Sequence, residues 1–314
     1  MPSQHVRAPS TLSSRAKRGI CFSLLLVLVL SPVARAQGPS NRSRILGIAE
    51  VRLLSTDLSS ARNFCAHIVG ANKISPNVFS PNQLQSVALY DAPSSVPSNL
   101  LAEIVFETDS LRDLSAYLAA QKIQYTLELT SVQTWDVIRP AYSALSVLDP
   151  EGHKISFKQR SGNPSGTIPK GAIRIIHAGF IVHDRAAMEH FYKDILGFRP
   201  YWHGGMKDDE TSWVSLQVPD GSDWLEFMLY DPAGKDKRFL GIMNHIALGV
   251  TDIHAAQEQL RKNGAPLTEE PKIGRDGKWQ LNLYDPDLTR IEFMEFTPVQ
   301  KPCCSEFTAP HPKP

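Results

Sequence analysis

The chain has 314 residues, of which 42% are hydrophobic and 21% are charged, and its formal net charge is +1. This length predicts about two domains, and the composition excludes an intrinsically disordered chain. A charge so close to zero also excludes a chain-wide basic surface, so we expect no nucleic-acid partner.

The first 36 residues have the pattern of a secretory signal peptide. A basic stretch at residues 15–18 precedes an apolar run at Ile20–Leu30, and a small-residue cleavage site follows at Ala34–Ala36. The apolar run is shorter than the roughly 20 residues that cross a bilayer. We therefore predict that residues 1–36 are removed on export to a periplasmic or extracellular location, with no membrane contact afterwards. An uncleaved N-terminal anchor is the alternative.

The predicted leader also accounts for much of the positive charge. It contains five of the 33 basic residues and no acidic residue, whereas the whole chain has 32 acidic residues. The exported chain is therefore expected to be mildly acidic, with a formal charge near −4.

Residues 45–160 show alternating strand and helix patterns. An apolar run that ends at Asp57 precedes a helical pattern, and a second run that ends at Asp109 precedes another. Asp is a favourable N-cap, and the apolar spacing after it is typical of amphipathic helices. Cys65 lies on the first helical pattern and is predicted to be a core residue. A late strand is predicted at 149–157.

A segment rich in Gly, Pro and Ser at 161–170 is predicted to be a linker, and residues 171–297 then repeat one pattern twice. Each copy has an apolar strand that begins with His, an amphipathic helical pattern and three alternating strands. The polar residues at equivalent positions of the two copies are His177 and His245, and Glu226 and Glu292.

The same rhythm in both halves predicts an α+β fold of four βαβββ units, paired into modules at 45–160 and 171–297. Residues 298–314 form a Pro-rich tail with the adjacent cysteines Cys303 and Cys304. Adjacent cysteines do not easily bridge each other, and no second Cys or His pair completes a zinc pattern. We interpret the pair as a feature of the tail.

The repeated polar residues predict a metal site. If paired units bring equivalent positions together, two imidazoles and two carboxylates meet in one cup. Such donors suit divalent iron, manganese, nickel, cobalt or zinc, and an ionised Glu inside a strand is costly unless it is paired or bound to metal. The expected metal ligands are His177, Glu226, His245 and Glu292.

The motifs resemble those of a known family. Residues 175–198, with their His-x-x-Phe-x-Val opening and Leu196-Gly197-Phe198 ending, are similar to the first motif of glyoxalases. Residues 285–292 resemble the last strand of the same family. Over 45–297 the chain thus resembles the vicinal oxygen chelate superfamily, which includes glyoxalases, extradiol dioxygenases and bleomycin-resistance proteins. The resemblance implies curved mixed sheets that form a metal cup and places the family's ligands on the four residues above.

The N-terminal module departs from this pattern. Aligning its predicted helix starts and last strand with those of the C-terminal module places Glu50, Ala102 and Ser156 opposite the first His, the second His and the last Glu. The fourth position, near 84–91, has no clear match. Ala and Ser cannot supply these metal bonds, so we predict a module without metal that serves as scaffold or pocket wall.

Three functions remain open. The resemblance first implies a glyoxalase-like isomerase or lyase that acts on a small oxygenated molecule chelated to the metal, with Glu226 or Glu292 as the catalytic base. Glutathione, the family's usual thiol partner, is scarce outside the cytoplasm, which argues against this class for an exported protein.

The second function is an extradiol-type dioxygenase that uses Fe(II) held by His177, His245 and Glu292. The family's signature expects a second-sphere His and Tyr before the last strand. No His precedes this strand here, and Tyr284 is too close to Asp285. His203 is the candidate for a substitute acid or base, although a loop His more often lies on the surface.

The third function is a non-enzymatic protein that holds a small molecule, as resistance proteins do. Tryptophans at strand spacing could line its cavity or simply fill the core: Trp202, Trp213, Trp224 and Trp279. Arg275 and Lys278 could bind an anionic substrate, although a solvated hairpin loop is the simpler interpretation. The sequence leaves the oligomeric state open, with a homodimer among the arrangements it allows.

Overall fold

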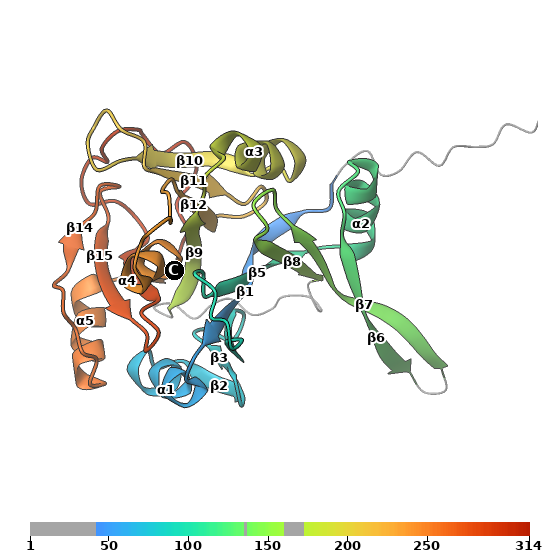
Figure 1. The fold of residues 1–314 in the computed structure, drawn as a ribbon, viewed down its shortest axis with the longest axis horizontal. Helices are drawn as coiled ribbons and strands as arrows, with labels where there is room; N and C mark the ends of the chain where they lie inside the picture. Colours follow the sequence, from blue (N-terminus) through green and yellow to red (C-terminus); the bar gives the residue numbers. More distant parts are fainter. Residues whose placement is uncertain (1–41, 135–136, 160–172) are drawn as a thin grey trace, which may run out of the picture. The chain divides into compact units, whose positions relative to one another are not determined.

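The computed structural model describes residues 42–134, 137–159 and 173–314 (Figure 1). The predicted leader at 1–36 and the predicted linker at 161–170 lie outside these residues. In the described part of the chain, the helices are too short or too polar to cross a membrane.

The described residues form two eight-stranded mixed sheets with few helices, which confirms the predicted fold class. The first sheet has the strand order β2-β3-β4-β1-β5-β8-β7-β6. Its strands are β1 (Ile45–Ser55), β2 (Asn72–Ser75), β3 (Val78–Ser80), β4 (Ser86–Asp91), β5 (Leu101–Thr108), β6 (Thr126–Thr134), β7 (Val137–Leu148) and β8 (Lys154–Gln159). Its helices are α1 (Leu58–Asn63), which continues into the π-helical turn η1 (Phe64–Ile68), and α2 (Leu111–Ala120).

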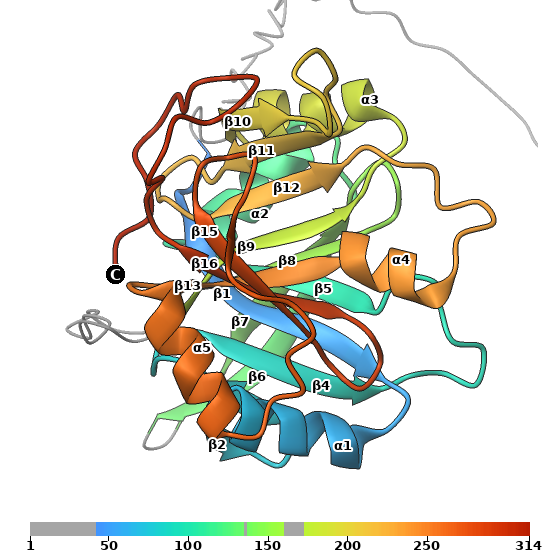
Figure 2. The same ribbon diagram turned by 90° about the vertical axis from the view of Figure 1, so that its left-hand side faces the viewer.

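The second sheet repeats this topology in the order β10-β11-β12-β9-β13-β16-β15-β14. Figure 2 shows β10, β11 and β12 following one another in this sheet. Its strands are β9 (Arg174–Ile181), β10 (Arg199–Gly204), β11 (Trp213–Gln217), β12 (Trp224–Met228), β13 (His245–Val250), β14 (Lys272–Ile273), β15 (Trp279–Tyr284) and β16 (Arg290–Glu295). Its helices are α3 (Arg185–Glu189) with the π-helical turn η2 (His190–Ile195), α4 (Lys237–Met243) and α5 (Ile253–Lys262). Each sheet thus contains two βαβββ units, and α4 is an additional helix between the units of the second sheet.

Helix starts follow from capping side chains. The carboxylate of Asp57 accepts hydrogen bonds from the backbone N–H groups of Ser59 and Ser60 at the start of α1, as its sequence position predicts. At α2, however, the hydroxyl of Ser110 accepts from Asp113, so the cap lies one residue beyond Asp109. This shift of one residue changes the alignment of the two modules, as described below.

The two sheets share one hydrophobic core, which contains Cys65 as expected. Polar contacts also join the first strands of the two sheets. The side-chain amide of Gln85 donates to the carbonyl oxygens of Ile48 and Ile175, both at 2.8 Å. The N–H of Ile48 donates to Asp223 Oδ2 at 2.9 Å. The N-terminal sheet therefore packs directly on the strands that carry the candidate site.

The C-terminal tail packs on the second sheet as an ordered segment. Phe307 lies 4.9 Å from the ring centroid of Tyr201 and, together with Cys303, contacts a cluster that includes the buried Trp202 and Trp224. The expectation that Cys303 and Cys304 do not bridge is wrong, because the two form a disulfide with each other. The tail thus covers aromatic side chains that the sheet alone would expose.

This packing predicts that Phe307→Ala lowers the free energy of unfolding by about 2 kcal/mol, because apolar surface that the ring shares with Tyr201 and Trp202 becomes exposed to water. Urea denaturation followed by tryptophan fluorescence measures the change. Val299→Ala is the matched control in the same segment, because Val299 is 52% exposed, and it should leave stability close to that of the wild type. Equal effects of the two variants would show that the tail is not packed as described.

Candidate metal centre in the C-terminal sheet

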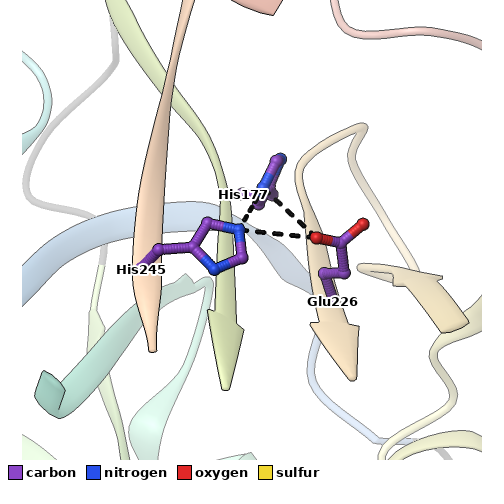
Figure 3. Close-up of side chains that lie close together, drawn as sticks. All are labelled: His177, Glu226 and His245. Carbon is purple, nitrogen blue, oxygen red and sulfur yellow. Dashed lines mark hydrogen bonds and ion pairs between the residues drawn. The ribbon is translucent and has the colours of Figure 1, made fainter. Parts of the chain in front are cut away.

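The four predicted ligands come together on the central strands of the second sheet. His177 Nε2 and His245 Nε2 are 3.0 Å apart. Glu226 Oε2 lies 3.4 Å from His245 Nε2 and 3.9 Å from His177 Nε2. Glu292 Oε2 lies 3.5 Å from His177 Nε2 and 3.8 Å from His245 Nε2. Figure 3 shows three of the four, His177, Glu226 and His245, pointing toward one another from three strands.

Strand register explains this convergence. Glu226 on β12 and His245 on β13 both pair with Gly179 on β9, and Glu292 on β16 pairs with Ala247. Because side chains alternate across a strand, the polar groups share one face while intervening residues such as Phe180 enter the core. A Cβ atom at position 179 would lie 2.0 Å from His245 Cε1, so only glycine leaves room for the imidazole. Gly179 is a site residue that was not predicted, although a glycine inside a strand is the sequence signal that could have indicated it.

Burial and charge set the protonation of the four groups. Both imidazoles are fully buried, and burial, with Arg290 and His177 adding to it, lowers the pKa of His245 to about 4. Burial opposes ionisation of Glu292, but Arg290 and the two imidazoles outweigh it and lower the pKa of this carboxyl to about 2. The pKa of Glu226 is also lowered, because the imidazoles outweigh its burial. Near neutral pH, His245 is thus neutral and both carboxyls are ionised, which are the forms that bind metal.

The donor set fits a divalent metal. His245 Nδ1 lies 3.1 Å from the carbonyl oxygen of Met243, an arrangement that keeps the proton on Nδ1 and the lone pair on Nε2. The ring of His177 packs on Trp224 at 4.7 Å, and its buried Nδ1 has no hydrogen-bond partner among the residues that the structure describes. Two imidazole nitrogens and two carboxylates around one point match the ligands that iron, manganese, nickel, cobalt and zinc accept.

A cavity of about 400 Å³ opens beside these groups. Both carboxylates, Glu226 and Glu292, line it. Of the four tryptophans that were candidates for a cavity wall, Trp202 and Trp213 line it, whereas Trp224 is buried against His177 and Trp279 packs on His254. Arg275, one of the two residues expected as possible contacts of an anionic substrate, also lines the cavity. The cavity can therefore hold a small molecule in contact with the candidate metal ligands.

The structure does not bring His203 to this site. His203 is exposed on β10, next to Trp202, and strand alternation turns it away from the cavity that Trp202 lines. Its backbone N–H donates to the hydroxyl of Ser305 at 2.9 Å. The prediction of His203 as a catalytic acid or base thus has no geometric support.

The interpretation of Lys278 as part of a solvated hairpin loop is wrong, because its side chain is fully buried. Its Nζ lies 3.3 Å from the hydroxyl oxygen of Tyr201 and faces the rings of Trp224 and Phe307 at 4.5 and 5.1 Å. Burial lowers the pKa of Lys278 to about 8, although Asp276 and more distant carboxylates oppose the shift. The cover comes from the C-terminal tail, which local sequence around Lys278 could not indicate.

The N-terminal sheet has a counterpart of the site with different residues. Strand pairing places Glu50 and Ser156 at the positions of His177 and Glu292, as the sequence alignment expected. The position of His245, however, belongs to Glu103 and not to Ala102, because Ser110 rather than Asp109 caps the following helix. The fourth position, which sequence alignment left open, is Ala88.

A side-chain cation fills this second cup. Arg52 occupies the position of Gly179, and its guanidinium donates to Glu50 Oε1 at 2.7 Å and to Glu103 Oε2 at 3.0 Å. Lys154 Nζ lies 3.0 Å from the same Glu103 oxygen. The two carboxylates of the N-terminal cup are therefore balanced by covalently attached positive charge.

Comparison with known proteins identifies the family. The family model described as "Glyoxalase/Bleomycin resistance protein/Dioxygenase superfamily" matches residues 174–293. Lactoylglutathione lyase of Haemophilus influenzae is 32% identical over 125 residues, which cover 39% of this chain and 93% of that protein. The chain belongs to this superfamily. The matched region coincides with the sheet that carries the four converging side chains.

The fold similarity to solved structures covers both sheets of this superfamily member. A catechol 2,3-dioxygenase superposes with a TM-score of 0.59 at 14% identity, covering 87% of this chain and 96% of that one. An extradiol ring-cleaving dioxygenase from B. fuscum gives a TM-score of 0.58 at 20% identity, covering 86% and 76% of the two chains. At these identities the likeness concerns the fold alone.

The charge arrangement of the N-terminal cup predicts that Arg52→Met lowers the free energy of unfolding by about 3 kcal/mol, because Glu50 and Glu103 lose their bridging cation in a largely buried place. Urea denaturation measures this change. Arg44→Met removes a similar ion pair, to Asp109, but from an exposed site, so its stability should stay close to that of the wild type. A harmless Arg52→Met would contradict the role of Arg52 as the internal cation.

Proposed function

We propose that this chain is a metal-dependent isomerase or lyase of the glyoxalase type, acting on a small oxygenated molecule that chelates a divalent metal. The observation that carries the proposal is the convergence of two imidazoles and two carboxylates at the wall of one cavity. The residues that would hold the ion are His177, Glu226, His245 and Glu292. A bound divalent ion supplies polarisation of a substrate carbonyl oxygen.

In this proposal Glu226 is the catalytic base that moves a proton between neighbouring substrate atoms. Its side chain is 15% exposed at the cavity, whereas that of Glu292 is 3% exposed. Arg290 Nη2 lies 3.9 Å from Glu292 Oε2 and helps to hold that carboxylate in its ionised form. A carboxylate that accepts and returns a proton needs access to substrate and freedom from a permanent cationic neighbour, and Glu226 meets both conditions better.

An extradiol-type dioxygenase with Fe(II) on His177, His245 and Glu292 is the alternative. Glu226 argues against it, because a fourth donor at the same point leaves fewer open positions than a two-His, one-carboxylate triad. His203, the candidate second-sphere group, is turned away. A non-enzymatic binding protein is the third function, and the assays below separate all three.

We further propose that the protein acts after export, as its N-terminal sequence predicts. Outside the cytoplasm a glutathione adduct is a poor candidate for the natural substrate. A different small oxygenated molecule then occupies the cavity. Proteolytic mapping of the N-terminus of the secreted protein tests this part, and a protein retained in the cytoplasm with its leader intact would contradict it.

Metal binding is the first test. His177→Ala and His245→Ala should each weaken binding of nickel or zinc by more than about 100-fold, because loss of a ligand exceeds the usual effect of changes around the ligands. Titration calorimetry and metal analysis of the purified protein measure this loss. His203→Ala is the matched control and should bind metal as the wild type does. Unchanged metal content in both ligand variants would disprove the metal centre.

The reaction class is the second test. Glu226→Gln keeps an oxygen donor but removes the base, so kcat for isomerisation of 2-oxoaldehyde–thiol adducts should fall by about 100- to 10,000-fold with metal still bound. Oxygen uptake with a catechol panel under ferrous iron, without isomerase activity, would favour the dioxygenase instead. Inactivity in both assays with tight ligand binding would favour the binding protein.

A further inference from the structure

Arg290 contacts the candidate metal centre and also lines the cavity. It is the first residue of β16, its side chain is 13% exposed, and it lines the cavity. Its Nη2 lies 2.7 Å from His245 Nε2, the nitrogen proposed to bind the metal. A ring nitrogen has one lone pair in its plane, so His245 cannot accept from Arg290 and bind a metal ion at the same time. Metal binding therefore releases this N–H group.

The charge of Arg290 then lacks a counterion. Glu292 is the single carboxylate within 4.0 Å of its guanidinium among the residues that the structure describes. In the proposed metal centre, Glu226 and Glu292 neutralise the divalent ion and no longer balance Arg290. A buried cation without a partner is costly, so a negative charge on the bound molecule would be favoured at this place.

Two buried polar atoms of residues that line this cavity also lack hydrogen-bond partners. Neither Arg290 Nε nor Asn282 Oδ1 has a hydrogen-bond partner within the described ranges. Asn282 is 7% exposed, and its Nδ2 is held by Glu269 Oε2 at 2.9 Å, which directs Oδ1 elsewhere. Because β15 and β16 pair Asn282 with Glu292 and Tyr284 with Arg290, the two unpartnered groups lie on one face of neighbouring strands. Buried donors and acceptors are normally satisfied, which indicates a ligand that supplies both.

The other cations of the cavity already have acidic partners. Arg275 pairs with Asp208 and donates from Nε to the carbonyl oxygen of Gly205 at 3.1 Å. Lys272 Nζ lies 3.1 Å from Glu269 Oε2. Among the cations of this cavity wall, Arg290 is therefore the one that, in the described part of the chain, has no carboxylate partner outside the proposed metal centre.

We propose that Arg290 and Asn282 form an anion subsite beside the metal centre, so that the substrate is a small carboxylate with a chelating hydroxyl or carbonyl oxygen. Arg290 donates to the carboxylate, and Asn282 Oδ1 accepts a hydrogen bond from a neighbouring hydroxyl group. This inference rests on the proposed metal-dependent function. It also fits the cavity, whose volume of about 400 Å³ suits a small molecule.

The test compares lactate with lactamide, which have similar shapes and differ in charge. Each is titrated into the nickel-loaded full-length protein, with the fluorescence of Trp202 and Trp213 at the cavity wall as the signal. Arg290→Met should weaken lactate binding by about 10- to 100-fold, the effect of a hydrogen bond to a charged group, and lactamide binding by less than about threefold. Arg275→Met, which removes the cation already paired with Asp208, should leave both affinities within about threefold of the wild type.

Asn282→Leu provides a second variant that leaves Arg290 in place and removes the acceptor Oδ1, together with the hydrogen bond to Glu269. Because lactate and lactamide carry the same hydroxyl group, this variant should weaken binding of both by about 2- to 10-fold and keep the preference for lactate. Equal loss of lactate and lactamide binding in Arg290→Met would overturn the subsite, as would a preference that depends on Arg275 instead. Metal analysis precedes each titration. A wild-type protein without bound metal overturns the proposed function and the subsite with it, whereas a loaded protein without charge preference overturns the subsite alone.

Discussion

Two carboxylates that point into the same buried space require positive charge between them, and each of the two sheets contains such a pair. In the C-terminal sheet, Glu226 and Glu292 face each other across the imidazoles of His177 and His245. The fold holds these groups on hydrogen-bonded strands, so they cannot move apart to reduce repulsion. A divalent metal ion would supply this positive charge and would also use the lone pairs of the imidazole nitrogens.

The N-terminal sheet meets the same requirement with its own side chains. Arg52 takes the place of a glycine, and its guanidinium reaches both Glu50 and Glu103. In the other sheet Gly179 leaves that space to an imidazole. Besides the different residues at the four ligand positions, the cup with an internal cation thus has arginine where the cup suited to an external cation has glycine.

The sequence predicted the parts of the site that depend on repetition. His and Glu recur at equivalent strand positions, and pairing of repeated units is enough to bring them together. Features that depend on distant segments could not be predicted from the sequence. They are the tail that buries Lys278, the glycine that leaves room for His245, and the contact of Arg290 with His245 Nε2. The assignment of Ala102 failed for a local reason, because Ser110 competes with Asp109 for the helix cap. The position of His203 outside the cavity could not be predicted from the sequence, because the pairing of β10 with β11 decides which face of the strand the side chain takes.

The internal cation of the N-terminal cup has a thermodynamic consequence. The guanidinium of Arg52 is part of the chain, so every folded molecule contains it. Its contribution to the free energy of unfolding therefore does not depend on the concentration of any ligand. A cup that takes its cation from solution gains stability with the logarithm of free metal. Because both sheets share one core, the N-terminal sheet contributes stability that does not depend on whether the proposed site in the other sheet holds metal.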